Sequence, residues 1–230
     1  MNSIAVRLAA VRERIAGAAA RAGRQPADVK VVAAGKTQPA TAVAEAVAAG
    51  VDAVGENRVQ EAVAKRPLVG GSASWHLIGP LQRNKARHAL DAFDVIETVD
   101  RAELADRLET LLAGTPRVVP VFLEVNIGGE AQKSGITPDT APPLADHLLA
   151  RCPHLRLVGV MTVPPWDPDP ERSRPHFAAL RDLADRLVHL HGLPPLELSM
   201  GMSGDFEVAV EEGATLVRLG RVLFGEREPV

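Results

Sequence analysis

The chain has 230 residues, of which 46% are hydrophobic and 24% charged, with a formal net charge of -3 at pH 7. The near-neutral charge argues against a protein that wraps nucleic acid, which needs a concentrated basic face, and the single cysteine, Cys152, argues against a disulfide scaffold or a multi-cysteine zinc site. No apolar run approaches the roughly 20 residues that a membrane span needs, so we expect no membrane association.

Residues 1–24 carry five arginines and one acidic residue, a composition also found in transit peptides. Ile4, Leu8, Val11 and Ile15, however, recur at helical spacing. We therefore expect an N-terminal helix that packs on the rest of the chain and keeps its arginines in solvent. This interpretation predicts a cytoplasmic protein.

The rest of the chain alternates between short β-branched runs and alanine- or leucine-rich stretches of helical pattern. The runs predict strands near residues 29–35, 52–56, 75–79, 94–99, 118–126, 156–162, 196–200 and 216–219. The helical patterns lie near residues 39–49, 57–65, 82–89, 101–113, 138–151, 173–191 and 204–212. Gly50 and Gly213, just past two of these patterns, are typical of helix ends.

Eight strands with helices between them predict an α/β fold, a single (β/α)8 TIM-type barrel with an extra N-terminal helix, over residues 1–230. The near-continuous apolar strands fit a parallel sheet that is covered on both faces. A doubly wound open sheet is the alternative. Residues 164–175 contain five prolines and predict a loop after the sixth strand, either a rigid surface connection or a lid.

In such barrels the active site lies at the carboxyl ends of the strands. Here the residues at those ends are polar, small or cationic. They are Lys36, Glu56, Asn57, His76, Glu124, Asn126, Thr162, Ser199, Met200, Gly201, Ser203, Arg218 and Gly220. This composition predicts a binding site at that rim.

Lys36 follows an apolar strand, and a partly desolvated lysine near other cations becomes a nucleophile for an aldehyde carbon. The plainer interpretation is a solvated lysine at a strand end. The loops after the seventh and eighth strands are common phosphate sites in barrels, where Ser199, Ser203 and Gly220 would offer hydroxyl and backbone N–H groups. Ser203 is also placed to cap a helix starting near Asp205.

A phosphate-bearing aldehyde held by a lysine indicates pyridoxal 5'-phosphate, although phosphorylated ligands of aldolases fit as well. Arg218 lies near the expected barrel mouth, where an arginine can face a pyridine nitrogen or form a structural salt bridge. The seven histidines and Cys152 form no spacing typical of a metal site, so we expect no metal.

Several runs together resemble the pyridoxal phosphate homeostasis proteins, which share the barrel of the N-terminal domain of alanine racemase. The resemblance covers nearly the whole chain. The runs are AAGKTQP around Lys36, GENRVQE from Gly55, WHLIGPLQRNKAR from Trp75, NIGGEAQKSGI from Asn126, LVGVMTVP from Leu157 and LSMGMSGDFEVAVEEGATLVRLGRVLFGER from Leu198.

The resemblance implies that Lys36 forms a Schiff base with pyridoxal 5'-phosphate. It also implies that Asn57 and His76 line the ring, that Met200 lies close by, and that Arg218 faces the pyridine nitrogen.

The same resemblance places the phosphate on Ser199, Gly220 and the backbone beside Arg221. Lys133 matches a lysine of the family pattern, for which transient handling of the cofactor is a hypothesis and a surface charge the alternative.

The sequence departs from the family pattern near the expected entrance. Gly35 stands where serine is common, Gln38 where lysine is common, Arg58 where tyrosine is common, and Gly204 where an acidic residue is common. None of these positions is an expected ligand, so the departures bear on the electrostatics of the entrance.

The family is understood to bind and buffer the cofactor without established catalytic turnover, which implies a non-enzyme with apo cofactor-dependent enzymes as transient recipients. The chain contains no tyrosine and leaves no room for a second domain, whereas the two-base racemases of this fold use a tyrosine from a second domain. The alternatives are a weak amino-acid racemase that uses Lys36 and a Schiff-base aldolase without the cofactor. We expect a monomer.

Overall fold

The computed structural model describes residues 3–225. Eight parallel strands form a closed barrel in chain order, with β1 paired to β8, so the predicted barrel is confirmed and the open sheet is excluded. The strands are β1 (Lys30–Ala34), β2 (Ala53–Glu56), β3 (Ser74–Leu77), β4 (Val95–Val99), β5 (Val119–Glu124), β6 (Leu155–Met161), β7 (Glu197–Ser199) and β8 (Leu216–Leu219).

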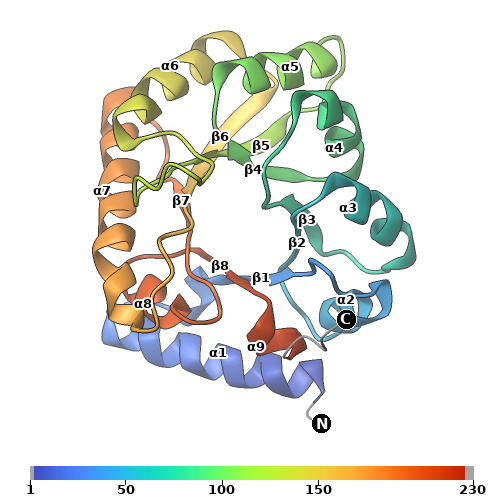
Figure 1. Cartoon of the computed structure of the whole chain (residues 1–230), viewed down its shortest axis with the longest axis vertical. Coiled ribbons are helices and arrows are strands. Elements are labelled where there is room, and N and C mark those ends of the chain that lie inside the picture. The colour runs from blue at the N-terminus through green and yellow to red at the C-terminus, as the bar shows by residue number, and fades with distance from the viewer. Residues whose placement is uncertain (1–2, 226–230) are drawn as a thin grey trace.

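Helices surround the barrel, as Figure 1 shows in a view into the ring of strands. They are α1 (Ile4–Arg21), α2 (Ala40–Ala48), α3 (Val59–Lys65), α4 (Ala86–Ala92), α5 (Ala102–Leu112), α6 (Ala141–Arg151), α7 (Arg174–His191), α8 (Phe206–Glu211) and α9 (Arg221–Phe224). Short 3₁₀ turns are η1 (Pro26–Asp28), η2 (Arg66–Leu68), η3 (Arg83–Lys85), η4 (Pro138–Thr140) and η5 (Pro170–Ser173). Within residues 3–225 no helix has the length and apolar character needed to cross a membrane.

The expected N-terminal helix is α1, which begins after Ser3, where the serine hydroxyl accepts a hydrogen bond from the backbone N–H of Val6. Leu8, Val11 and Ile15 on its inner face are buried. Figure 1 shows α1 lying along α8 and α9 beside the first and last strands. The apolar spacing therefore reflects packing, because α1 lies against α8 and α9 on the outside of the barrel.

Two apolar layers fill the molecule. The larger one lies between the strands and the helices, and the smaller one fills the barrel interior with Val32, Ala53, Phe122, Met161 and Leu216. Because side chains in a strand alternate between faces, residues two positions further along these strands also point inward. The apolar layer thus supports a polar layer nearer the carboxyl ends of the strands.

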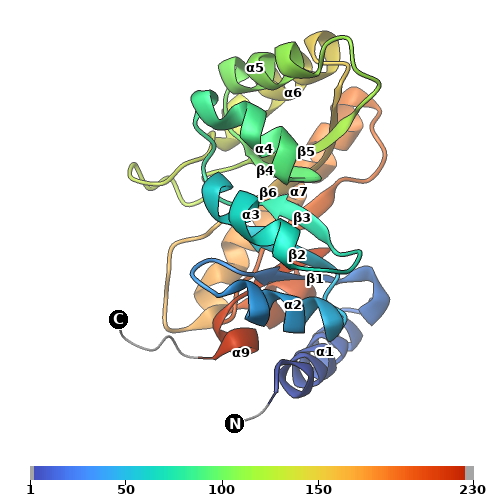
Figure 2. The ribbon, with the colours of Figure 1, turned by 90° about the vertical axis from the view of Figure 1, so that its right-hand side faces the viewer.

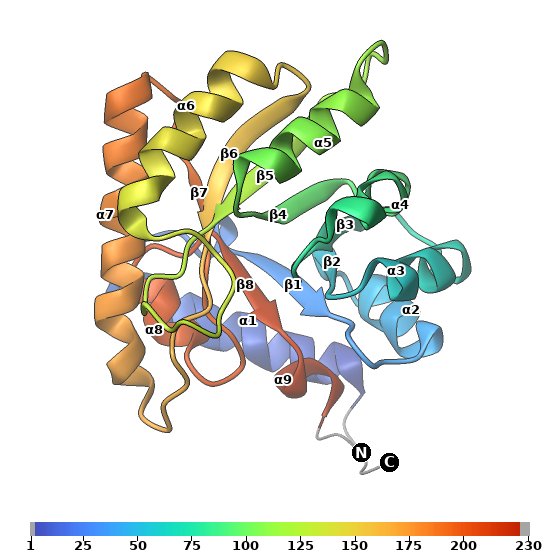
Figure 3. The same cartoon turned by 45° about the horizontal axis from the view of Figure 1, so that its top comes forward.

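The loops after β5 and β6 extend from one side of the barrel, the side of the strands' carboxyl ends (Figure 2). The loop expected over residues 164–175 is shorter than predicted, because η5 occupies Pro170–Ser173 and α7 begins at Arg174. Pro175 fits inside the first turn of α7, where no intrahelical donor is needed. Figure 3 shows β8 running directly into α9, a helical turn that the sequence pattern did not indicate.

Candidate functional site

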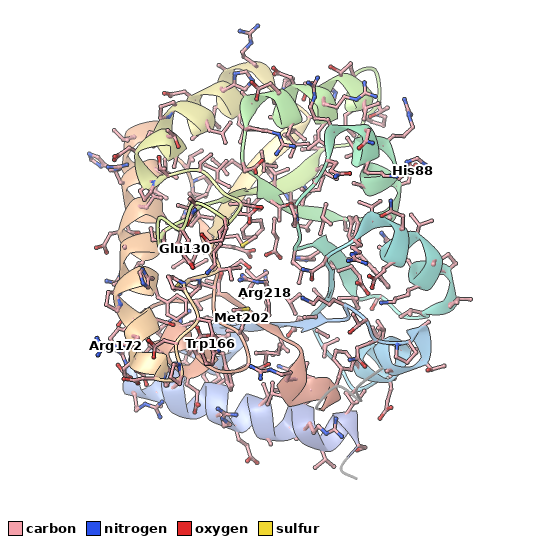
Figure 4. All side chains as sticks on the ribbon, in the orientation of Figure 1. His88, Glu130, Trp166, Arg172, Met202 and Arg218 are labelled. Atoms are coloured by element: carbon pink, nitrogen blue, oxygen red, sulfur yellow. The ribbon has the colours of Figure 1, made fainter. Side chains whose placement is uncertain are left out.

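A cavity of about 350 Å³ opens at the carboxyl ends of the strands. It is lined by Arg218 of β8 and by residues from the loops after β1, β2, β6, β7 and β8, among them Lys36, Asn57, Trp166, Met202 and Arg221. In Figure 4 Arg218 points toward the middle of the ring of strands, and Met202 and Trp166 lie beside it. The cavity thus lies where enzymes of this architecture place their active sites.

Lys36 lies in a tight turn directly after β1 and has an exposed side chain. The turn is closed by a 2.9 Å hydrogen bond from the backbone N–H of Gln38 to the carbonyl of Gly35. Lys36 also lines a second cavity of about 520 Å³ between the loops after β1, β2 and β3. Its amine is therefore reachable from two sides.

The floor of the first cavity is a buried polar network centred on Arg218. The Arg218 guanidinium donates to the Ser199 hydroxyl and to the carbonyl of Thr162, both at 2.7 Å. Ser199 donates in turn to Glu97, whose other oxygen lies 2.6 Å from Nδ1 of His76. Four strands, β3, β4, β7 and β8, thus share one network of side chains.

Charge balance keeps this network ionised. Burial alone raises the pKa of Glu97, but the hydrogen bond and charge of His76, with Arg218 and Ser199, outweigh it and lower that pKa. Burial lowers the pKa of Arg218, opposed chiefly by Glu97, and an arginine stays cationic even so. Because a carboxylate only accepts, the proton of the His76–Glu97 hydrogen bond resides on Nδ1 of His76.

The loops after β7 and β8 form a cradle of backbone donors. Within residues 3–225 no acceptor is hydrogen-bonded to the backbone N–H groups of Ser203, Gly204 or Arg221. The Ser203 hydroxyl accepts from the N–H of Val222 at 3.4 Å, which joins the two loops. Open N–H groups from two adjacent loops, beside the Arg221 side chain, suit an anion such as phosphate.

The expectation that Ser203 caps α8 is wrong. The helix begins at Phe206, Asp205 takes the N-cap position, and the hydroxyl of Ser203 faces the start of α9 instead. The Asp205 carboxylate binds the backbone N–H of Met202 at 2.7 Å, which shapes the loop before the helix.

The sequence-predicted residues fall into three groups. Those that line the first cavity are Lys36, Asn57, Ser203, Arg218, Gly220 and Arg221. Those that are buried and not among its lining residues are His76, Ser199 and Met200.

Lys133 forms the third group, outside the cavity lining. Its ammonium donates a hydrogen bond to the carbonyl of Pro164 at 2.8 Å and forms an ion pair with Glu130, which is labelled in Figure 4. Lys133 therefore connects the loop after β5 to the loop after β6.

Sequence reasoning missed Glu97, the acid at the centre of the floor network. Its signal was available, since an acidic residue stands in the apolar run DVIETV at a strand position. A buried acid inside a barrel requires donors around it. The structure supplies them from β3, the neighbouring strand, and from β7, which is distant in sequence from Glu97.

Asp106, His147 and Cys152 form a cluster of possible metal ligands outside the barrel, with one ligand atom from each within 4.8 Å of the others. Burial, aided by nearby carboxylates, raises the pKa of Cys152 to about 11. Nε2 of His147 lies 2.7 Å from Oδ1 of Asp106, so a hydrogen bond accounts for the approach of these two side chains without an ion. We assign no site to this cluster.

The closed parallel barrel belongs to the class of alanine-racemase-like barrels. Residues 6–228 match the family described as "Alanine racemase, N-terminal domain". Glu226 and Arg227, the last residues of the final sequence motif, lie outside the described part of the structure.

Relatives that match nearly the whole chain identify the family within this class. The chain is 47% identical to the "Pyridoxal phosphate homeostasis protein" of Pseudomonas aeruginosa, over 99% of this chain and 97% of the relative, and 42% identical to the protein of that name from Aquifex aeolicus, over 96% and 97%. The solved structure of PipY from Synechococcus elongatus PCC7942, with PLP bound, has a TM-score of 0.83 at 36% identity and covers 97% of this chain and 100% of that one. The chain belongs to the pyridoxal phosphate homeostasis protein family, as its motifs predict.

Proposed function

We propose that the chain binds pyridoxal 5'-phosphate in the first cavity, holds it as a Schiff base on Lys36, and buffers or delivers it without catalytic turnover. The observation that carries this proposal is a single cavity that joins the Lys36 amine to the open N–H groups of the loops after β7 and β8. That arrangement suits a ligand with an aldehyde and a phosphate at different ends. The shared name of the relatives and the PLP-bound structure of PipY support it.

The residues present fit this cofactor. A cavity of about 350 Å³ lies within the range of small-molecule sites. The Ser203 hydroxyl and the N–H groups of Gly204 and Arg221 would hold the phosphate, and Arg218 would face the ring nitrogen. The bound cofactor supplies an aldehyde for reversible reaction with amines. Lys36 would provide the amine that takes up this aldehyde with release of one water, and the return of water would release the cofactor.

Two features favour buffering over catalysis. The Arg218 guanidinium donates hydrogen bonds but does not give up a proton. A ring nitrogen facing it would therefore stay unprotonated, and the ring would withdraw electrons poorly. The chain also contains no tyrosine that would serve as a second base. Because Lys36 is exposed, water and other amines would reach a cofactor held on it, which suits release to apo cofactor-dependent enzymes.

The first test is the absorbance spectrum of the protein after addition of pyridoxal 5'-phosphate, followed by borohydride reduction and peptide mass mapping. We expect a visible band and a pyridoxyl group on Lys36, both lost in Lys36→Ala. Lys30→Ala is the matched control, since Lys30 lies at the opposite end of β1 and pairs with Glu197. A colourless protein that takes up no cofactor, or a label on another lysine, overturns the proposal.

A second test separates a carrier from a racemase. The loaded protein is incubated with L-alanine in deuterated water, and the α-proton is followed by NMR. A carrier leaves that proton in place, whereas exchange at a catalytic rate means that the protein is an enzyme.

Delivery is tested by mixing loaded protein with an apo cofactor-dependent enzyme. We expect that enzyme to regain activity while the visible band of the carrier falls. If the band persists and the recipient stays inactive, the protein stores the cofactor and does not deliver it.

A further inference from the structure

Lys65, the last residue of α3, binds the turn that carries Lys36. Its side chain is only 13% exposed, and its ammonium donates to the carbonyl of Gly35 at 2.9 Å, to Oε1 of Glu56 at 2.8 Å and to Oε2 of Glu61 at 3.1 Å. All three hydrogen atoms of the ammonium therefore have acceptors. One of these acceptors is the backbone directly before Lys36.

The turn itself is strained. Thr37 has φ of 66°, the only positive φ of a non-glycine residue within residues 3–225. Thr37 stands at the third position of the turn closed by Gly35 and Gln38, where a positive φ favours glycine. A β-branched residue takes this conformation only when its surroundings impose it.

Glu61 supplies part of that constraint. Its Oε2 accepts a hydrogen bond from the backbone N–H of Thr37 at 3.2 Å and also contacts the Lys65 ammonium. The carbonyl before Lys36 and the N–H after it are thus both held by one pair of oppositely charged side chains from α3. Lys36 itself is left free to point into the cavities.

Glu56 anchors the pair to the barrel. It is fully buried at the end of β2, and burial raises its pKa while the hydrogen bond and charge of Lys65 oppose that effect. A Cβ atom added at Gly35 would lie 2.9 Å from Oε1 of Glu56, so the turn packs directly on this carboxyl group. If Lys65 shifted, this buried carboxyl group would lose the hydrogen bond that its Oε1 accepts from the ammonium.

We propose that Lys65, with Glu56 and Glu61, is a positioning residue that holds the Lys36 turn in the conformation that captures the aldehyde. Lys65 lines neither of the two cavities that Lys36 faces, and it acts through the backbone of Gly35 and, with Glu61, of Thr37. This inference rests on the proposed function, in which Lys36 is the anchor.

The main test is Lys65→Met, with uptake of pyridoxal 5'-phosphate followed by stopped-flow absorbance. We expect uptake to slow by about ten- to a hundredfold, since small misplacements of a reacting group have effects of that size. Lys30→Met, which removes an exposed ion pair from the other end of β1, should leave the rate unchanged. Unchanged uptake by Lys65→Met overturns the proposal.

A rescue variant separates positioning from a general loss of structure. Thr37→Gly removes the steric strain of the positive φ, so adding it to Lys65→Met should recover most of the lost uptake rate. Because Lys65→Met alone leaves Glu56 buried without its cation, the pair Glu56→Gln and Lys65→Met is measured as well, with and without Thr37→Gly. If Thr37→Gly restores uptake in neither background, the turn is not what Lys65 controls.

Hydrogen–deuterium exchange without any cofactor gives an independent readout. In Lys65→Met the amides of Thr37 and Gln38 should exchange faster while those of the barrel strands keep their protection. Equal exchange in both proteins contradicts the positioning role. A wild-type protein that fails to take up the cofactor overturns the proposed function, and the exchange result still decides whether Lys65 holds the turn.

Discussion

Glu124 is a buried carboxyl group at the end of β5 that the proposed function does not use. Its Oε2 has no hydrogen-bond partner within residues 3–225. Burial, with the nearby charge of Asp100, raises the pKa of Glu124 to about 7, against the opposing charges of Arg218 and Arg101. The group is therefore largely protonated in mildly acidic solution and ionises near neutrality.

This pKa predicts a pH-dependent stability. Between about 4.5 and about 7 the folded protein holds a proton on Glu124 that the unfolded chain has lost, so the free energy of unfolding falls as pH rises through this window and then levels off. Glu124→Gln should remove this decline and exceed the wild type by up to about 3 kcal/mol above the window. Urea unfolding of both proteins from pH 5 to pH 8 measures the difference, and parallel curves would contradict the prediction.

The residues of the site differ in how well the sequence predicted them. Lys36, Asn57 and Gly220 line the cavity because they directly follow strands, a position that sequence order reveals. Ser199 is predicted to lie at the phosphate, and what the sequence did not indicate is that its hydroxyl hydrogen-bonds Glu97 and Arg218 in the floor. The two hydrogen-bond partners of the Ser199 hydroxyl lie on β4 and β8, which are far apart in sequence. No local sequence pattern shows which inward-facing polar side chains will meet in the barrel.

At the scale of elements, the strands were predicted closely because each is a short β-branched run between clear helical patterns. β8 (Leu216–Leu219) has the predicted bounds, and β1 differs by one residue at each end. α9 was missed, since its four residues are too few to show a period, and it forms where Gly220 turns the chain against α1. Short elements are set by tertiary contacts that propensity does not report.

Gly159 in β6 shows how tightly the strands enclose the interior. A Cβ atom there would lie 2.3 Å from a ring atom of Phe122 and 2.5 Å from the carbonyl of Glu197 in β7. The added methyl group would collide with backbone that cannot move without breaking the barrel. Glycine at this position is therefore a packing requirement of β5, β6 and β7.

Gly159→Ala should accordingly lower the free energy of unfolding by about 1–3 kcal/mol, the usual effect of overpacking an interior. Gly70→Ala is the control, because no heavy atom lies within 4 Å of a Cβ built at Gly70. Denaturant unfolding of both variants tests the difference. A loss of the same size in both would mean that the effect reflects glycine replacement in general and not the Phe122 contact.

At the scale of the whole molecule, the proposed site bridges the two ends of the chain. β1 pairs with β8, with Ala33 opposite Leu219, and this pairing closes the barrel. Lys36 follows one of these strands, and Gly220 and Arg221 follow the other. A ligand bound to both loops would therefore join the first and last strands at the point of closure.

This arrangement predicts that the cofactor stabilises the entire barrel. A ligand that binds only the folded state at a hundred times its Kd adds about 2.7 kcal/mol, which for a chain of this size raises Tm by roughly 5–10 °C. Lys36→Ala keeps the anion cradle and loses the covalent link, so at the same concentration of pyridoxal 5'-phosphate its Tm should rise less. Inorganic phosphate has no aldehyde and would bind only the cradle, so it should raise Tm by the same small amount in the wild type and in Lys36→Ala. Calorimetry that shows equal shifts with pyridoxal 5'-phosphate for wild type and Lys36→Ala would mean that the cradle alone carries the binding energy and that the link across β1 and β8 contributes nothing.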